Sequence, residues 1–267
     1  MVKLPSDGAG CGQGSATQAK QEISLEMGHY AVRLAETDED RATLYRLRFV
    51  VFNLEMSEGL DNAFQTGEDR DEFDACCDHL MVEDLRDGQV VGTYRLQSGP
   101  MAAQNLGYYS AQEFDFSPYE NVRGQLLELG RACVHREHRS MEVLTLLWRG
   151  IAQYALHRDL RYLIGCSSLN TQDTTLGAAM YRSLRRALVE PSLRTLPLTA
   201  CAFPLVENFG PAPKPPKLLQ AYLAVGAKIC GPPAIDRQFG TIDFLTLLDL
   251  QGLSPVVRTR FLREEPS

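Results

Sequence analysis

The sequence lacks the features that would place the protein in a membrane or in an oxidising compartment. No apolar run in its 267 residues reaches the 18 or so residues that a transmembrane helix needs. Residues 1–20 contain no apolar core and do not form a secretory signal. The seven cysteines are odd in number and form no CxxC pair, so neither a disulfide framework nor a zinc ribbon is supported. We therefore expect reduced thiols in a cytoplasmic protein that binds no metal.

The net charge of −7 conceals an uneven distribution. Residues 1–130 contain 10 Lys and Arg against 23 Asp and Glu, a balance of −13, whereas residues 131–267 contain 17 against 11, a balance of +6. The basic second half favours an anionic ligand, an acidic carrier protein or a lipid surface as partner. Nucleic acid is not expected, because the basic residues form no continuous run and no aromatic residues are interleaved with them.

The apolar periodicity predicts an α/β (α+β) fold, a mixed central sheet with helices on its faces. Helices are expected from about 37 to 55 and at 141–157, 177–189 and 218–225, with an acidic loop at 59–75. Residues 79–85 and 89–96 flank the turn former Asp87-Gly88, which is typical of a β-hairpin. Further strands are expected at 125–134, 161–169 and 242–248. Residues 1–28, rich in Gly, Gln and Ser, are predicted to be a disordered leader before one domain at 29–267.

The predicted strand 125–134 contains the most informative motif, Glu128-Leu129-Gly130-Arg131. In a regular strand Glu128 and Arg131 point to opposite faces, because side chains alternate. A one-residue bulge at Gly130 would bring both to one side and expose backbone N–H groups there. A carboxylate that accepts a proton and N–H groups that polarise a carbonyl oxygen suit aminolysis of a thioester. The alternative is a structural Arg–Glu ion pair within the sheet.

Basic residues mark two further places in the second half. Arg136 and Arg139 lie in the loop His135–Ser140, directly before the helix at 141–157, where a helix N-terminus favours an anion. His135 and His138 have no third ligand nearby, so this loop is not expected to bind a metal. A second group of basic residues lies on one predicted helix and is expected to dock an acidic carrier protein. Its members are Arg182, Arg185 and Arg186.

Taken together, these residues resemble two related families of acyltransferase. Arg48 with Phe52, Asp71 with Asp74, GTYRL at 92–96 and ELGRACVH at 128–135 follow the order seen in acyl-homoserine-lactone synthases. CSSL at 166–169 and AYLAVGAKICGPPAIDRQFGTIDFLTLLD at 221–249 are similar instead to bacterial L-ornithine N-alpha-acyltransferases. The resemblance extends from about residue 32 to residue 253.

The resemblance implies a GNAT fold with a C-terminal extension. It also implies transfer of a 3-hydroxyacyl group from acyl carrier protein to the alpha-amine of ornithine, with the acyl-phosphopantetheine thioester as co-substrate and no bound cofactor. Arg136 and Arg139 would then bind the phosphopantetheine, and Arg182, Arg185 and Arg186 the carrier. The substrate-binding residues implied are Arg48, Phe52, Asp71, Asp74, Arg95, Cys133, Val134, Ser167 and Ser168.

The expected mechanism is direct transfer. The amine attacks the thioester carbonyl, Glu128 is the base, and backbone amides near Cys133 and Val134 hold the oxyanion. Arg131 would orient Glu128 or hold the carboxylate of the amino acid. An acyl-enzyme on Cys133 or Cys166 is not expected, because the sequence ties no histidine to either thiol.

Other functions remain open at this point. An N-acyl amino-acid synthase acting on another amine, such as glycine, has the same sequence features. A lactone synthase is disfavoured, because the tryptophan that those enzymes place soon after the phenylalanine is absent and Trp148 is the only tryptophan. A catalytically inactive acyl-carrier or lipid-binding module is a further alternative. Residues 218–225, flanked by Lys214 and Lys217, are predicted either to contact a membrane surface, peripherally, or to pack in the core.

Overall fold

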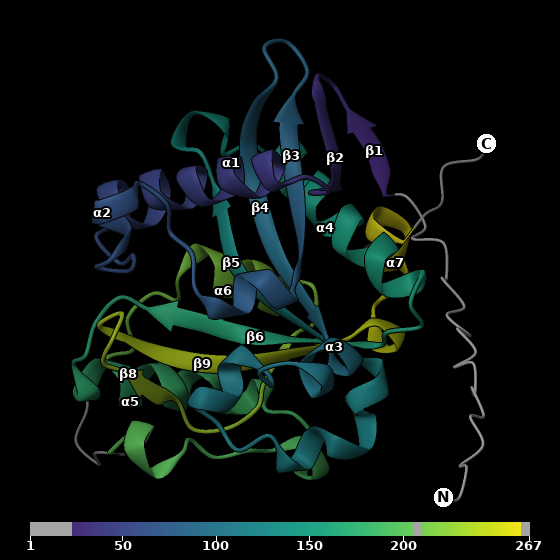
Figure 1. Cartoon of the computed structure of the whole chain (residues 1–267). Helices are drawn as coiled ribbons and strands as arrows, with labels where there is room; N and C mark the ends of the chain where they lie inside the picture. Colours follow the sequence, from purple (N-terminus) through teal and green to yellow (C-terminus); the bar gives the residue numbers. More distant parts are fainter. Residues whose placement is uncertain (1–22, 205–209, 263–267) are drawn as a thin grey trace, which may run out of the picture.

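A computed structural model describes residues 23–204 and 210–262 of the chain (Figure 1). Nine strands form one sheet in the order β1-β2-β3-β4-β5-β6-β9-β7, and β8 pairs with β9. All pairs are antiparallel except β5 with β6. The strands are β1 (Ser24–Met27), β2 (Tyr30–Leu34), β3 (Asp78–Asp84), β4 (Gln89–Ser98), β5 (Leu126–Val134), β6 (Tyr162–Leu169), β7 (Lys228–Ile229), β8 (Ala234–Asp236) and β9 (Thr241–Asp249).

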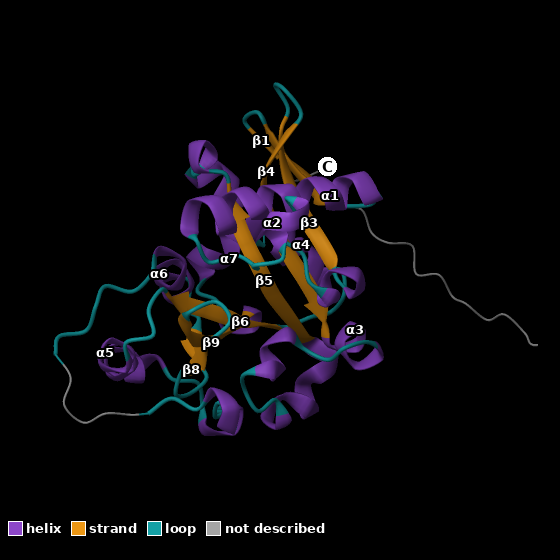
Figure 2. Cartoon of the chain, turned by 60° about the vertical axis from the view of Figure 1, so that its left-hand side comes forward, coloured by secondary structure: helices purple, strands orange, loops and turns teal. Residues whose placement is uncertain are grey.

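Helices lie on both faces of this sheet, as the sequence predicts (Figure 2). The α-helices are α1 (Asp38–Arg48), α2 (Ala63–Thr66), α3 (Gly99–Gln104), α4 (Met141–Leu156), α5 (Thr174–Leu184), α6 (Lys217–Ala224) and α7 (Pro255–Phe261). A π-helix, Phe49–Met56, continues α1. Short 3-10 helices occupy Glu72–Cys76, Tyr109–Gln112, Ser117–Gln125, Arg136–His138, Arg185–Ala187, Pro191–Leu193, Thr199–Cys201 and Leu250–Gly252.

Local sequence signals explain where the main elements begin. Thr37 and Asp40 form a capping box at the start of α1, in which each side chain accepts from the other's backbone N–H. The side chain of Ser140 caps α4 by accepting from the N–H of Val143. Gly88 adopts φ +74° in the turn between β3 and β4, a conformation that glycine reaches without strain.

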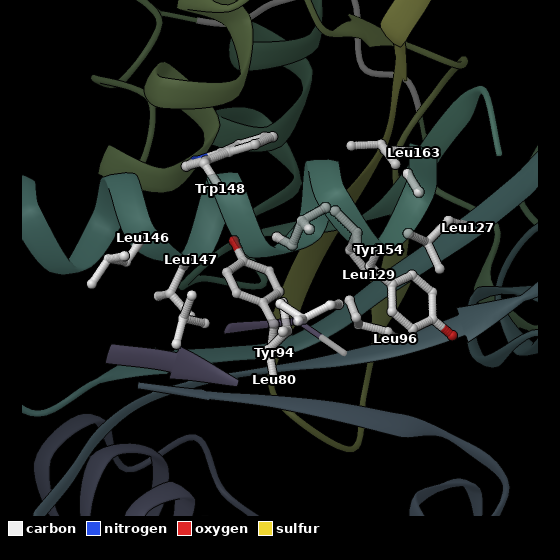
Figure 3. Packing of buried hydrophobic residues seen from close by; sticks show 14 of the residues in the cluster. Leu80, Tyr94, Leu96, Leu127, Leu129, Leu146, Leu147, Trp148, Tyr154 and Leu163 are labelled. Carbon is white, nitrogen blue, oxygen red and sulfur yellow. The ribbon is translucent and has the colours of Figure 1, made fainter. Parts of the chain in front are cut away.

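The two faces of the sheet bury different helices because side chains alternate along each strand. On one face Leu80 and Leu96 pack under Leu147 and Trp148 of α4, in the cluster that Figure 3 shows. On the other face Met81, the neighbour of Leu80, packs with α1. The sheet therefore lies between α1 and α4.

The strands β5 and β6 pair only over Leu126–Glu128 and Tyr162–Ile164, and then separate (Figure 1). A Cβ atom on Gly165 would lie 2.3 Å from the carbonyl oxygen of Leu129, so only glycine allows the backbones to cross this closely. Beyond this point, no strand in the described part of the chain pairs with β5 on its β6 side. The backbone groups of β5 there have no strand partner on that side.

Two expectations need correction. The stretch 59–75 is not a continuous loop, because α2 and the start of the 3-10 helix Glu72–Cys76 lie within it. The leader does not extend to residue 28, because Ile23 is buried and β1 begins at residue 24; residues 1–22 lie outside the described residues.

One face of α6 packs in the core. Leu219 is completely buried, and the hydroxyl of Tyr222 lies 2.6 Å from that of Tyr94 on β4. Leu218 and Leu223 are only partly buried, so the membrane contact of residues 218–225 stays a prediction. Among the described residues, no helix is both long enough and apolar enough to cross a bilayer.

Candidate active site

A bulge in β5 is present, as predicted, but it centres on Arg131 rather than on Gly130, which still pairs with Arg95. Thr93 of β4 pairs with Cys133, and Arg95 pairs with Gly130. The pairs are two residues apart on β4 but three residues apart on β5, so β5 contains one extra residue. Arg131 itself takes up the extra residue with φ +49°. Strain of this kind persists only where the surroundings hold it in place.

The bulge places Arg131 beside Tyr109, next to which Glu128 also lies. The Arg131 guanidinium is 5.6 Å from the Tyr109 ring centroid, and the Glu128 carboxylate accepts from the Tyr109 N–H at 2.8 Å. Arg131 forms an ion pair with Asp71 at 2.9 Å. Within the described residues, no hydrogen bond joins Arg131 to Glu128, so its predicted role in orienting Glu128 stays a prediction.

A buried charge network joins α1, the 3-10 helix Glu72–Cys76 and β3–β5. Arg48, which is wholly buried, donates to Asp74 Oδ1 at 2.7 Å, and its other terminal nitrogen lies 3.0 Å from Nδ1 of His79. Arg95 donates to Asp71 at 2.6 Å and to Asp74 at 3.2 Å. The structure thus brings together four of the residues that the resemblance implied.

The network is electrically balanced. Its three arginines, at 48, 95 and 131, face three aspartates, at 69, 71 and 74. Burial alone would raise the pKa of Asp74, but the charges of Arg48 and Arg95 outweigh it and hold that pKa well below its usual range. Burial and the charge of Arg48 lower the pKa of His79 to about 4, so His79 is neutral at pH 7. This network positions the bulge rather than offering a free charge to a ligand.

Glu128 lies deep in the site and is held by backbone. Its two carboxylate oxygens accept from the N–H groups of Tyr109 and Ser110, both at 2.8 Å. Burial raises its pKa above the ordinary value, although these hydrogen bonds oppose the shift. A carboxylate with a raised pKa is a better proton acceptor than an exposed one, and Glu128 also fixes the turn that carries Tyr109.

The loop before α4 has the shape of an anion site. Arg136–His138 forms one 3-10 turn, and Ser140 caps α4, so the loop and the helix N-terminus lie together. Arg136 is exposed. Arg139 donates to the carbonyl of Val134 and forms a two-point ion pair with Glu55, at 2.6 and 2.8 Å. Its guanidinium is therefore already neutralised by a carboxylate.

The two thiols near the site are unsuited to nucleophilic attack. Burial raises the pKa of Cys133 to about 12, and burial with the nearby carboxylate of Glu113 raises that of Cys166 well above its usual value. Thiols attack as thiolates, which neither group forms at neutral pH. The six cysteines within the described ranges are all free.

The remaining predicted residues take no part in the charge network. Phe52 is half-buried against the apolar cluster under α1, and Ser168 is exposed and hydrogen-bonds to Asp243. The hydroxyl of Ser167 is buried without a partner in the described structure. Arg182, Arg185 and Arg186 are all exposed, at the end of α5 and in the 3-10 turn that follows.

Sequence reasoning missed two buried acids, Glu113 and Asp243. Their carboxylates and the Cys166 thiol lie within 4.8 Å of one another. A usable signal was present for Asp243, which interrupts the apolar run of β9. Charged residues are rarely buried without a partner or a function. No equivalent signal marks Glu113, which follows a short 3-10 helix in an irregular segment.

Two hollows differ in character. A small apolar cavity of about 20 Å³ lies where β5 and β6 separate, and Leu129, Trp148, Leu163 and Tyr222 line it. A wide surface hollow of about 490 Å³ lies between α1 and residues 68–75. Arg41, among other charged groups of both signs, lines this second hollow, so it would not stabilise an acyl chain.

The chain is similar to proteins of known family and known structure. The acetyltransferase (GNAT) domain family matches residues 47–149. The crystal structure of the acyl-homoserine-lactone synthase LasI aligns with a TM-score of 0.50 and 15% identity, covering 89% of this chain and 99% of that chain. With the separated β5 and β6 and the loop before α4, these findings define the fold class of the protein, a GNAT fold.

Curated relatives place the chain more narrowly. The L-ornithine N(alpha)-acyltransferase of Brucella abortus is 34% identical over 85% of this chain and 87% of its own length. That of Rhodobacter capsulatus is 30% identical over 88% of this chain and 95% of its own length. The chain belongs to the L-ornithine N(alpha)-acyltransferase family.

Proposed function

We propose that this protein transfers a fatty acyl group from an acyl carrier protein to the alpha-amine of L-ornithine, giving a lyso-ornithine lipid. The observation that carries this proposal is the kinship with L-ornithine N(alpha)-acyltransferases at 30–34% identity over 85–89% of the chain. The opening between β5 and β6 supports it, because an extended thioester arm needs an unpaired strand edge of this kind.

The donor is proposed to lie along the open edge of β5. Its phosphate would meet the loop His135–Ser140 and the N-terminus of α4, where backbone N–H groups and Arg136 favour an anion. Its acyl chain would enter the small apolar cavity between the separated strands. At about 20 Å³ that cavity does not hold a fatty chain as it stands, so Trp148 and Tyr222 must move apart when the donor binds.

The proposed reaction is a direct aminolysis. The alpha-nitrogen forms a bond to the thioester carbon while its proton passes to Glu128, directly or through water. The tetrahedral oxyanion is held by backbone N–H groups of β5 near Cys133 and Val134. The C–S bond then breaks, the amide forms, and the thiolate of the carrier takes up a proton to leave as a thiol. The protonated state of Cys133 and Cys166 supports this route over an acyl-enzyme.

The carrier protein is proposed to dock on the exposed arginines at 182, 185 and 186, which end α5 and follow it. Acyl carrier proteins are expected to be acidic partners, and opposite charge steers their encounter with a basic surface.

The proposal is tested with purified full-length protein, an acyl carrier protein loaded with a 3-hydroxyacyl group, and a panel of amino acids. Thiol release reports turnover, and mass spectrometry of the product identifies the acylated amine. Ornithine acylated at its alpha-nitrogen is the expected product. Acylation of glycine with no acylation of ornithine would overturn the proposal.

The role of Glu128 predicts the behaviour of Glu128→Gln. A glutamine cannot accept the proton, so turnover should fall by about 10²–10⁴-fold. The amide also turns an NH₂ group toward the N–H of Tyr109 or Ser110, so unfolding is measured in parallel and rates are taken where the variant is folded. Glu190→Gln, which changes an exposed carboxylate, should retain wild-type turnover. A folded Glu128→Gln enzyme with full turnover would remove Glu128 from the chemistry.

A further inference from the structure

Two buried carboxylates form a cluster that the proposed reaction does not use. Glu113 and Asp243 are only 6% and 4% exposed. Their carboxylate oxygens and the Cys166 sulfur lie within 4.8 Å of one another. Asp243 accepts from the hydroxyl of Thr241 at 2.8 Å, whereas Oε2 of Glu113 is buried with no hydrogen-bond partner in the described structure.

No positively charged side chain of the described residues neutralises these two carboxylates. The cluster differs in this from the balanced network around Arg48. Neither carboxylate has an Arg, Lys or His partner among the described residues. The charges that face the cluster add to the repulsion: Asp236 acts on both acids, Glu128 on Glu113, and Glu58 on Asp243.

The pKa values of the two acids indicate that the cluster lacks a positive charge. Burial, with the charge of Asp243, raises the pKa of Glu113 to about 9, and burial raises that of Asp243 to about 6. Buried acids without a cation are costly, and a bound cation would lower both pKa values and so favour the charged forms. The cluster is therefore prepared for a positively charged ligand.

The position of the cluster identifies which part of a ligand it meets. The Cys166 thiol donates to the Ser110 hydroxyl at 3.5 Å, and the N–H of Ser110 donates to Glu128 at 2.8 Å. Cys166 and Ser110 thus connect the two acids to the proposed base. A diamino acid whose alpha-amine faces Glu128 would extend its side chain in this direction.

We infer that Glu113 and Asp243 bind the side-chain ammonium of the acceptor amino acid, and so select a diamino acid over a neutral one. An alkylammonium has three N–H donors, which suit two carboxylates and a neighbouring hydroxyl. The inference rests on the proposed function, because it names the group that recognises the substrate of that reaction. A divalent metal fits less well, because the protonated Cys166 is a poor ligand and only two carboxylates remain.

The test compares L-ornithine with L-norvaline, which differs only in lacking the terminal amino group. Full-length enzyme and one acyl-carrier donor are used, and kcat/KM is measured for each acceptor by thiol release. The wild type should prefer ornithine by at least about 100-fold, because a site built for a polar group rejects an analogue without it. In Glu113→Gln and Asp243→Asn this ratio should fall by about 10–100-fold, mainly through a higher KM for ornithine.

A matched control variant and the ornithine-to-norvaline ratio of kcat/KM distinguish damage to the fold from a loss of substrate recognition. Glu190→Gln removes an exposed carboxylate and should leave the ratio unchanged. Damage to the fold lowers kcat/KM for both acceptors alike, so it does not move the ratio. If Asp243→Asn does not fold, the test uses Glu113→Gln alone. Oε2 of Glu113 has no hydrogen-bond partner in the described structure, so its replacement breaks no hydrogen bond.

Three results would overturn the inference. An unchanged ornithine-to-norvaline ratio in a folded Glu113→Gln enzyme would show that the cluster does not select the substrate, although the proposed function would stand. Stoichiometric metal in the purified protein, lost in that variant, would assign the cluster to a metal ion. A wild-type enzyme that acylates norvaline as well as ornithine would contradict the selection itself. No acylation of ornithine at all would instead remove the proposed function.

Discussion

Replacing Arg48 by methionine tests whether the buried network is a structural unit. Methionine keeps much of the side-chain volume but removes the charge that Asp74 accepts at 2.7 Å. The wholly buried position gives water no route to replace it. Breaking one partner of a buried ion pair costs about 3–5 kcal/mol, and here the remaining contact of Asp74 with Arg95 at 3.2 Å places the loss at the lower end.

The pH dependence of this loss follows from His79. In the wild type its pKa is lowered to about 4, by burial first and then by Arg48. A histidine whose folded pKa lies below its unfolded value of about 6.5 costs stability as the pH falls through that interval. Without Arg48, the nearby Asp74 favours the charged imidazole, and its pKa rises. The deficit of the variant should therefore shrink by roughly 1–2 kcal/mol between pH 7 and pH 5.

Urea unfolding at pH 7 and pH 5 measures both effects. Arg46→Met is the matched control, because Arg46 lies two residues away on α1 but is exposed and forms only surface ion pairs. It should cost less than about 1 kcal/mol at either pH. An Arg48→Met protein no less stable than Arg46→Met, or one whose deficit does not change with pH, would refute the account of the network.

Two further predictions concern the ends of the chain and the donor. Deleting residues 1–28 should lower the free energy of unfolding by about 2–3 kcal/mol or more, because the deletion removes strand β1 and the buried Ile23; thermal unfolding identical to that of the full chain would contradict this. Replacing the three arginines at 182, 185 and 186 by glutamate should raise KM for the acyl carrier protein about 10-fold or more at low salt. KM for a small pantetheine thioester should stay within about 2-fold, because steering by exposed charges acts on the larger charged partner. Equal changes for both donors, in a steady-state assay, would exclude the docking surface.

Local patterns in the sequence were enough to predict most of the sheet and the helix that covers it. Alternation and turn chemistry predict β3 and β4 around Gly88, and the 3.6-residue period predicts α4 after its cap. The bulge in β5 could also be predicted, because a carboxylate and an arginine three residues apart meet on one side only if an extra residue is inserted. These features depend on neighbours in sequence, so the sequence alone determines them.

The leader boundary, the packing of α6 and the partners of each charge depend on contacts between distant segments. Arg131 pairs with Asp71, 60 residues away, and Tyr222 meets Tyr94, 128 residues away. No local signal says which carboxylate an arginine will reach.

The Glu113–Asp243 cluster shows this difference most clearly. Its two acids are 130 positions apart in the sequence and come together only because β9 pairs with β6, beside the turn that Glu128 holds. The sequence by itself predicted five of the nine described strands, helix α4, the bulge and the family resemblance, whereas it did not predict β1, β2, β7 and β8. Only the tertiary structure decided which buried charges are neutralised by one another and which are left for a ligand, because burial and pairing are properties of the packed chain.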